Sequence, residues 1–150
     1  MKRRDQIKLT PEEQTTFLRD ARKAALATLD KEGFPHVVAM NFLARDGAIF
    51  MTSYGKAQKV VNIRRNPKVA VMVETGRTYS DLRGVMIRGR CEIIEEPATV
   101  EATMHAIRHK DAGGTAVPLG RLESAPKRVV LKVIPKKIAS WDHSKLGGRY

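Results

Sequence analysis

Apolar residues recur with the two-residue period of β-strands over much of this chain. Six runs alternate, or are rich enough in β-branched residues, to predict strands. They cover residues 25–29, 36–43, 48–53, 69–74, 83–95 and 128–134. Turn-forming stretches at 30–35 and 45–47 separate the first three runs, which predicts a β-meander.

Three other segments have the 3.6-residue period of helices. The first begins at Thr10, where Thr-Pro-Glu-Glu supplies an N-cap residue, an early proline and Glu13 in the capping-box position. The second is predicted over 56–66 and ends before Pro67, and the third runs from Pro97 to about Lys110. Segments 76–82, 111–126 and 138–150 are predicted to be loops or a tail.

Six antiparallel strands with short flanking helices predict a mainly β (α+β) domain, folded as a closed or partly closed barrel. The 150 residues suggest one domain over 1–150, with 1–8 as a flexible basic N-terminus and 140–150 as a C-terminal tail. Cys91 is the single cysteine, which is typical of a reducing compartment. The basic start lacks an apolar signal-peptide region, and no apolar run reaches the ~18–20 residues of a membrane span. We therefore expect a soluble, cytoplasmic protein that does not enter a membrane.

The chain is strongly basic, with 28 Lys and Arg against 16 Asp and Glu and a formal net charge of +12. The excess recurs along the whole sequence, so it predicts a charged surface or groove and favours acidic partners. Aromatic residues make up only 5%, so base-stacking platforms are scarce, and no nucleic-acid-binding fingerprint is present. Non-specific nucleic-acid binding is therefore the weaker interpretation of the charge, and no specific nucleic-acid partner is expected.

The stretch MTSYGKAQKVVNIRRNP, residues 51–67, combines hydroxyls and basic side chains at a predicted strand-to-helix junction. Free backbone N–H groups and the helix dipole favour an anion at a helix N-terminus. Thr52, Ser53, Lys56 and Lys59 could therefore form a phosphate cradle there. The alternative is that these residues only cap the helix and solubilise it.

Other polar positions are less specific. Asn41 interrupts an apolar strand and could face a ligand or simply solvent. His105 and His109 have the i, i+4 spacing of a metal pair, but no third ligand is apparent, so a solvated helix face is favoured and no metal is expected. Cys91 lies in a predicted strand, which favours a buried thiol over a nucleophile.

The order of these motifs resembles the pyridoxamine 5′-phosphate oxidase-like split β-barrel family, and within it the flavin/deazaflavin oxidoreductase branch, group B. The resemblance covers roughly residues 9–148 and runs from ALATLDKEGFPHVVAMNF to RVVLKVIPKKIASWDHSKLGG. Its most specific parts are K-x-x-K-x-x-N-[IL]-R-R-[DN]-P and the closing SWDHSKLG.

This resemblance implies a six-stranded split barrel and a homodimer that binds coenzyme F420, which the charge favours, or FMN in a groove between its chains. Thr52, Ser53, Lys56 and Lys59 would hold the phosphate, and Arg64 could meet the acidic tail of F420. Trp141 would approach the ring or the substrate, from the same chain or from the partner chain. The ring system itself would be lined by Val38, Ala39, Met40, Asn41 and Met51.

The implied activity is that of an oxidoreductase, which transfers a hydride between the cofactor and a small unsaturated substrate. No catalytic residue stands out, and Tyr79 is only a weak candidate for a proton donor. The pyridoxal phosphate-binding arginine and histidine motif of the family is missing near the C-terminus, so pyridoxamine phosphate oxidase activity itself is not expected. A non-enzymatic cofactor carrier is the alternative function.

Overall fold

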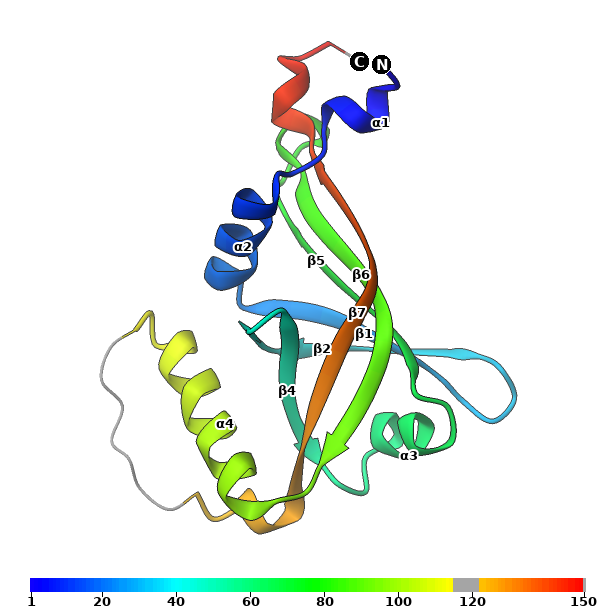
Figure 1. Cartoon of the computed structure of the whole chain (residues 1–150), viewed down its shortest axis with the longest axis vertical. Coiled ribbons are helices and arrows are strands. Elements are labelled where there is room, and N and C mark those ends of the chain that lie inside the picture. Colours follow the sequence, from blue (N-terminus) through cyan, green and yellow to red (C-terminus); the bar gives the residue numbers. More distant parts are fainter. Residues whose placement is uncertain (115–121, 150) are drawn as a thin grey trace.

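The computed structural model describes residues 1–114 and 122–149, which form one curled antiparallel sheet flanked by helices (Figure 1). In this part of the chain the sheet has seven strands in the order β2-β1-β5-β6-β7-β4-β3. The strands are β1 Lys23–Leu29, β2 Pro35–Asn41, β3 Leu43–Arg45, β4 Ala48–Tyr54, β5 Lys68–Thr75, β6 Arg83–Ile94 and β7 Arg128–Asp142. The predicted mainly β split barrel is confirmed, although the expected strand number was six.

The helices are short and lie outside the sheet. They are α1 Arg3–Gln6, α2 Pro11–Asp20, α3 Gln58–Arg65 and α4 Pro97–Asp111, with 3₁₀ turns at η1 Tyr79–Asp81, η2 Ala125–Lys127 and η3 His143–Leu146. The predicted capping box opens α2: the Thr10 hydroxyl accepts from the Glu13 N–H at 3.1 Å, and the Thr10 N–H donates to the Glu13 carboxylate at 2.7 Å. Part of the predicted loop 111–126 lies outside the described residues.

The seventh strand comes from a division of the predicted strand 36–43 at Phe42. β2 pairs with β1, whereas β3 pairs with β4, so two consecutive strands lie at opposite ends of the strand order. The Phe42 side chain is fully buried at this bend. A single inward-facing residue thus lets the sheet curl on itself and leaves the barrel split between β2 and β3.

The last strand is longer than predicted. β7 continues through the expected tail to Asp142 and pairs with β6 along its length, with one register shift beside Arg88 and Gly89. Lys136, Lys137 and Ile138 in its second half are exposed, which explains why this stretch resembles a tail in the sequence. At its end the buried Asp142 carboxylate forms a 2.8 Å ion pair with Arg83.

Two apolar clusters hold the fold together. The larger fills the inside of the curled sheet with residues such as Leu26, Met51, Val71, Ile87 and Leu131. A smaller cluster under α4 contains Ala48, Phe50, Val100 and Val130. The first part of β4 is therefore buried on both faces, and this strand reaches the surface only in its second half, where Thr52 is partly and Tyr54 half exposed.

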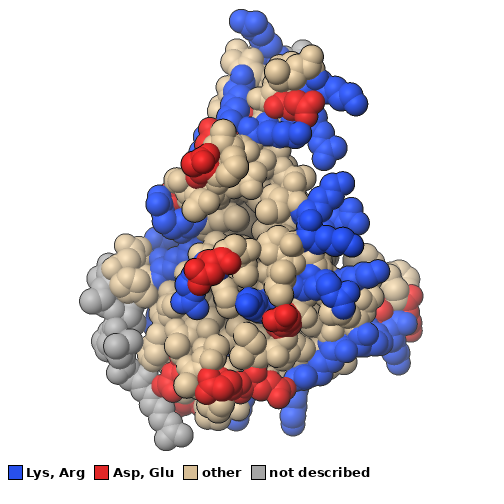
Figure 2. Space-filling model, in the orientation of Figure 1, with Lys and Arg blue, Asp and Glu red and all other residues tan. Residues whose placement is uncertain are grey.

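Basic side chains outnumber acidic ones, 28 to 16, and many of them lie at the surface. In Figure 2 Lys and Arg gather at the top and along the right of the face, whereas Asp and Glu form a row at the lower edge and smaller separate groups elsewhere. Among the described residues, no helix is long and apolar enough to cross a membrane.

Candidate functional site

The junction between β4 and α3 presents an uncapped helix N-terminus with two lysines beside it. Ala57 is the N-cap residue of α3 and provides no side-chain hydrogen bond, and the first turn contains no acidic residue. The helix begins at Gln58, two residues later than predicted, so Lys56 lies in the turn and Lys59 in the first helical turn. Both lysines oppose the helix dipole, which costs stability unless an anion is bound.

A pocket of about 810 Å³ opens beside this junction, and its lining includes four basic side chains and one acidic one. Lys56 comes from the junction and Arg64 from α3, whereas Lys127 ends η2 and Arg128 begins β7. Arg128 is brought here because it is the register partner of Tyr54, and its guanidinium lies 4.2 Å from the centre of the Tyr54 ring. Sequence reasoning missed Lys127 and Arg128 as site residues, although they belong to a visible basic cluster.

The lysine and arginine side chains at this pocket differ in their partners. Arg64 is paired with the Glu95 carboxylate at 2.5 Å, so its charge is already partly neutralised. The pKa of Lys59 is lowered, first by burial and then by the nearby charge of Arg128. Lys59 and Thr52 do not themselves line the pocket, but Lys59 is close enough to Arg128 for the two charges to repel each other, and an anion between them would relieve that repulsion.

The hydroxyl pair predicted for the cradle is divided between the two faces of β4, because successive side chains of a strand point in opposite directions. Ser53 is 2% exposed and donates its hydroxyl hydrogen to the Tyr54 carbonyl at 3.1 Å. Met51 is 0% exposed and lies in the core beside it. Thr52 faces the opposite side, which it shares with Tyr54, and is partly exposed. Of these three side chains, only Thr52 can reach a ligand directly.

The predicted ring-lining run 38–41 is divided in the same way. Val38 and Met40 pack against the core, whereas Ala39 is exposed and Asn41 partly exposed on the outer face of the sheet. β2 is an edge strand, so its outer backbone edge is also open.

Trp141 lies far from the pocket within one chain. It is on the same strand as Arg128, 13 residues further along, which corresponds to about 40 Å at ~3.3 Å per residue. Its indole ring covers Gly84, its register partner, and its N–H donates to the Glu74 carboxylate at 2.8 Å. A single chain therefore does not bring Trp141 and the basic pocket to one ligand.

These features define a split β-barrel protein. The antiparallel sheet curls and closes except between two consecutive strands, and a basic strand-to-helix junction lies on its surface. The pyridoxamine 5′-phosphate oxidase family model matches residues 10–142, and the chain belongs to this family. Among curated proteins, none is similar enough to match the chain.

Solved structures agree with this assignment. The conserved hypothetical protein Rv2991 from Mycobacterium tuberculosis is 34% identical, with a TM-score of 0.86 over 100% of this chain and 95% of that one. A structure named F420 reductase is 27% identical, with a TM-score of 0.71 over 87% of this chain and 98% of that one. An FAD-binding protein from Mesorhizobium loti, at 22% identity, shares the fold with a TM-score of 0.68 over 88% and 94% of the two chains.

Proposed function

We propose that this protein is an oxidoreductase that binds coenzyme F420, or else FMN, and transfers a hydride between it and a small unsaturated substrate. The observation that carries the proposal is the uncapped N-terminus of α3 beside the basic pocket. An anion placed there would meet a positive helix end, Lys56 and the Lys59–Arg128 pair. These residues fit the phosphate that F420 and FMN have in common.

The cofactor, when bound, supplies the hydride chemistry, and the protein residues hold and shield it. Thr52, Lys56, Lys59 and Arg128 bind the phosphate in this proposal, while Ser53 and Met51 support β4 from within the core. F420 is preferred for two reasons: the similar F420 reductase, and a net charge of +12 that suits a cofactor with an acidic tail.

We also propose that the working form is a homodimer, in which Trp141 of one chain completes the pocket of the other. An apolar row crosses the outer face of the sheet, where each residue is the register partner of the next. It consists of Ala39, Ala25, Met72, Met86 and Ala139. All five side chains are at least partly exposed, and Met72 is 41% exposed. A second copy covering this row would remove apolar surface from water and supply the missing Trp141.

Titration with F420 and with FMN, followed by cofactor fluorescence, tests the cofactor. The double variant Lys56→Ala, Lys59→Ala should weaken binding by about a hundredfold, because it removes two charge-assisted contacts. The matched control, Lys2→Ala with Lys31→Ala, removes the same charge from exposed positions elsewhere and should bind almost as well as the parent. Equal affinities for the two double variants would refute the cradle.

Mixing two inactive variants tests the shared site. Chains with Lys56→Ala, Lys59→Ala are refolded together with chains carrying Trp141→Ala. A mixed dimer then has one intact pocket, so about a quarter of all sites should recover in an equal mixture. If each site lies within one chain, no recovery will occur, and sedimentation showing a monomer would rule out the dimer directly.

A carrier without turnover is the second candidate. The pocket lining supports this role. Among the described residues, the one carboxylate that lines the pocket is Glu95, and because it is already paired with Arg64, no unpaired carboxyl group is present there for catalysis. Mixing the reduced cofactor complex with unsaturated acceptors separates the two roles. Oxidation of the cofactor at a rate that depends on acceptor concentration requires an enzyme, whereas release of unchanged cofactor fits a carrier.

A further inference from the structure

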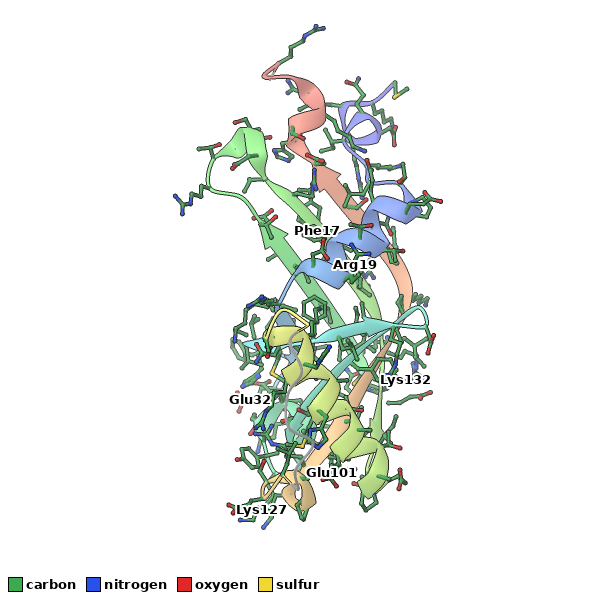
Figure 3. The ribbon with its side chains drawn as sticks, turned by 90° about the vertical axis from the view of Figure 1, so that its left-hand side faces the viewer. Phe17, Arg19, Glu32, Glu101, Lys127 and Lys132 are labelled. Atoms are coloured by element: carbon green, nitrogen blue, oxygen red, sulfur yellow. The ribbon has the colours of Figure 1, made fainter. Side chains whose placement is uncertain are left out.

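A second basic pocket lies on another part of the molecule, where the C-terminal ends of α2 and α4 approach each other beside β3 (Figure 1). In Figure 3 Arg19 lies on α2 above the C-terminal end of α4, whereas Glu101 lies near the opposite end of that helix. The pocket has a volume of about 480 Å³ and shares no lining residue with the pocket at the α3 junction.

All polar side chains that line this pocket can donate hydrogen bonds. They come from three elements, α2, β3 and α4, and are Arg19, Arg45, His105, His109 and Lys110. The rest of the lining is apolar and consists of Leu43, Ala44 and Ala106. A lining of cations and imidazoles around an apolar floor is complementary to a molecule that has an anionic group on an apolar body.

Lys110 is fixed in place and still has a donor to offer. Its ammonium group donates to the Leu18 carbonyl of α2 and the Phe42 carbonyl of the bend, each at 3.1 Å, and lies 3.8 Å from the centre of the Phe42 ring. An ammonium has three N–H groups, so one remains after these two bonds.

His105 has a ring nitrogen without a partner. Its side chain is only 15% exposed, and its Nδ1 atom is buried with no hydrogen bond, while Nε2 lies 3.9 Å from the Glu101 carboxylate. A buried polar atom left unpaired costs about 1–3 kcal/mol, and because Nδ1 is inaccessible in this ring orientation, a turn of the ring would be needed to offer it to a ligand.

Three carboxylates lie next to residues that line the pocket but do not line it themselves. Asp20 is paired with Arg19 at 3.0 Å, Glu101 is the neighbour of His105, and Asp111 follows Lys110 in sequence. They reduce the net charge around the pocket, so its attraction for an anion depends on short-range donors rather than on a long-range field.

The apolar floor continues beyond the basic end. A neighbouring groove of about 410 Å³ shares Arg19, Ala44 and Arg45 with the pocket and extends towards Ile49 and Ile138. A ligand with a chain of several carbons could therefore keep its charged group at Lys110 and lay its apolar body along this groove.

We propose that the pocket between α2, β3 and α4 binds an organic carboxylate with an apolar body. The carboxylate is held by Lys110, Arg45 and the imidazoles, and the body lies against Leu43, Ala44 and Ala106. Such a ligand is separate from the proposed cofactor and would bind whether or not that cofactor is present.

Octanoate is a suitable probe, with octanamide and inorganic phosphate as probes for the body alone and for an anion alone. Two-dimensional NMR of the whole protein should show saturable shifts around Ala44, Ala106 and His105 at millimolar octanoate, with clearly weaker binding of the other two probes. Arg45→Gln should reduce octanoate affinity by about tenfold, because it removes one charge-assisted contact from an exposed position; within the protein it also removes the guanidinium from above the Phe50 ring, 5.2 Å from its centre.

Two controls make the result specific. Arg4→Gln removes the same charge from α1 and should leave octanoate affinity unchanged, as should Lys56→Ala with Lys59→Ala at the other pocket. Equal binding of octanamide, equal binding of inorganic phosphate, an unaffected Arg45→Gln variant or no saturable binding would each overturn the proposal. Loss of cofactor binding in the lysine variants with octanoate binding retained would separate this site from the proposed function.

Discussion

The Trp141 ring lies over Gly84, and this contact predicts the effect of a substitution at Gly84. The position of Trp141 matters because this residue is part of the proposed shared site. A Cβ atom added at Gly84 would lie 2.5 Å from the indole Cε2 and 2.8 Å from Nε1. Carbon atoms in contact are normally 3.5–4.0 Å apart, so the ring must move by about 1 Å. The present bond from the indole N–H to Glu74 is 2.8 Å long, and a shift of this size would break it.

The size of the effect follows from these contacts. Gly84→Ala adds one methyl group against a ring and removes one hydrogen bond to a carboxylate. Overpacking by a methyl group costs about 1–3 kcal/mol. The ring is partly exposed and can swing outward, so we expect a loss of about 1–2 kcal/mol in unfolding free energy.

Intrinsic fluorescence is the direct assay, because Trp141 is the one tryptophan in the sequence. Displacement into water should shift the emission of the native protein to longer wavelength in Gly84→Ala. Gly89→Ala is the matched variant on the same strand: its added Cβ would meet the Ile134 and Pro135 backbone, which cannot swing away. It should cost about 3 kcal/mol or more and leave the native emission almost unchanged.

The two variants therefore separate a local displacement from a general loss of stability. If Gly84→Ala has the same native emission and the same unfolding free energy as the parent, the contact between the indole ring and Gly84 is refuted. A red shift of equal size in Gly89→Ala would show that emission reports general loosening of the sheet instead.

Three further predictions concern single groups. Burial lowers the pKa of Lys110 to about 8 in the folded protein, against 10.5 for an ordinary lysine, so the unfolded chain binds the proton more tightly. The unfolding free energy of the parent relative to Lys110→Met should therefore rise as pH increases from about 8 to 10.5, and a flat difference would contradict this. Burial also raises the pKa of Cys91 to about 12, so iodoacetamide should modify it only as fast as the protein unfolds; rapid labelling of native protein would refute this. Thr10→Ala removes the capping box and should cost about 1 kcal/mol in thermal unfolding, while Thr15→Ala in the same helix should cost less.

The sequence predicts a structural feature correctly where the interacting residues are neighbours in the chain. Thr10, Pro11 and Glu13 predict the start of α2 because every atom of the capping box lies within four residues. The same alternation that predicts β4 also separates Met51 and Ser53 from Thr52, since a strand cannot present adjacent side chains on one face. That part of the cradle could have been refined from the sequence by applying the strand period to the site as well as to the core.

Long-range pairing decided the features that the sequence did not predict. Phe42 continues an apolar run, and only closure of the barrel makes it a bend between two distant strands. The polar half of β7 is a strand because β6 lies beside it, and no local signal in KKIAS indicates that partner. Arg128 enters the pocket through its register with Tyr54, which lies more than seventy residues earlier in the chain. In each case the partner strand, rather than the local sequence, decides the conformation, because β-propensity depends strongly on tertiary context.

Asn62 shows how the most specific sequence motif combines structural support with residues of the proposed binding site. It is fully buried, donates from Nδ2 to the Thr28 hydroxyl at 3.0 Å and accepts from Gln58 at 2.8 Å. A buried amide with both ends paired fixes the rotation of α3 against β1, because any rotation would leave polar atoms unsatisfied. Lys59 lies three residues earlier on the same short helix, so its position beside Arg128 depends on this anchor. The K-x-x-K-x-x-N spacing thus joins the two lysines of the proposed phosphate cradle to an asparagine that anchors the helix on which Lys59 lies.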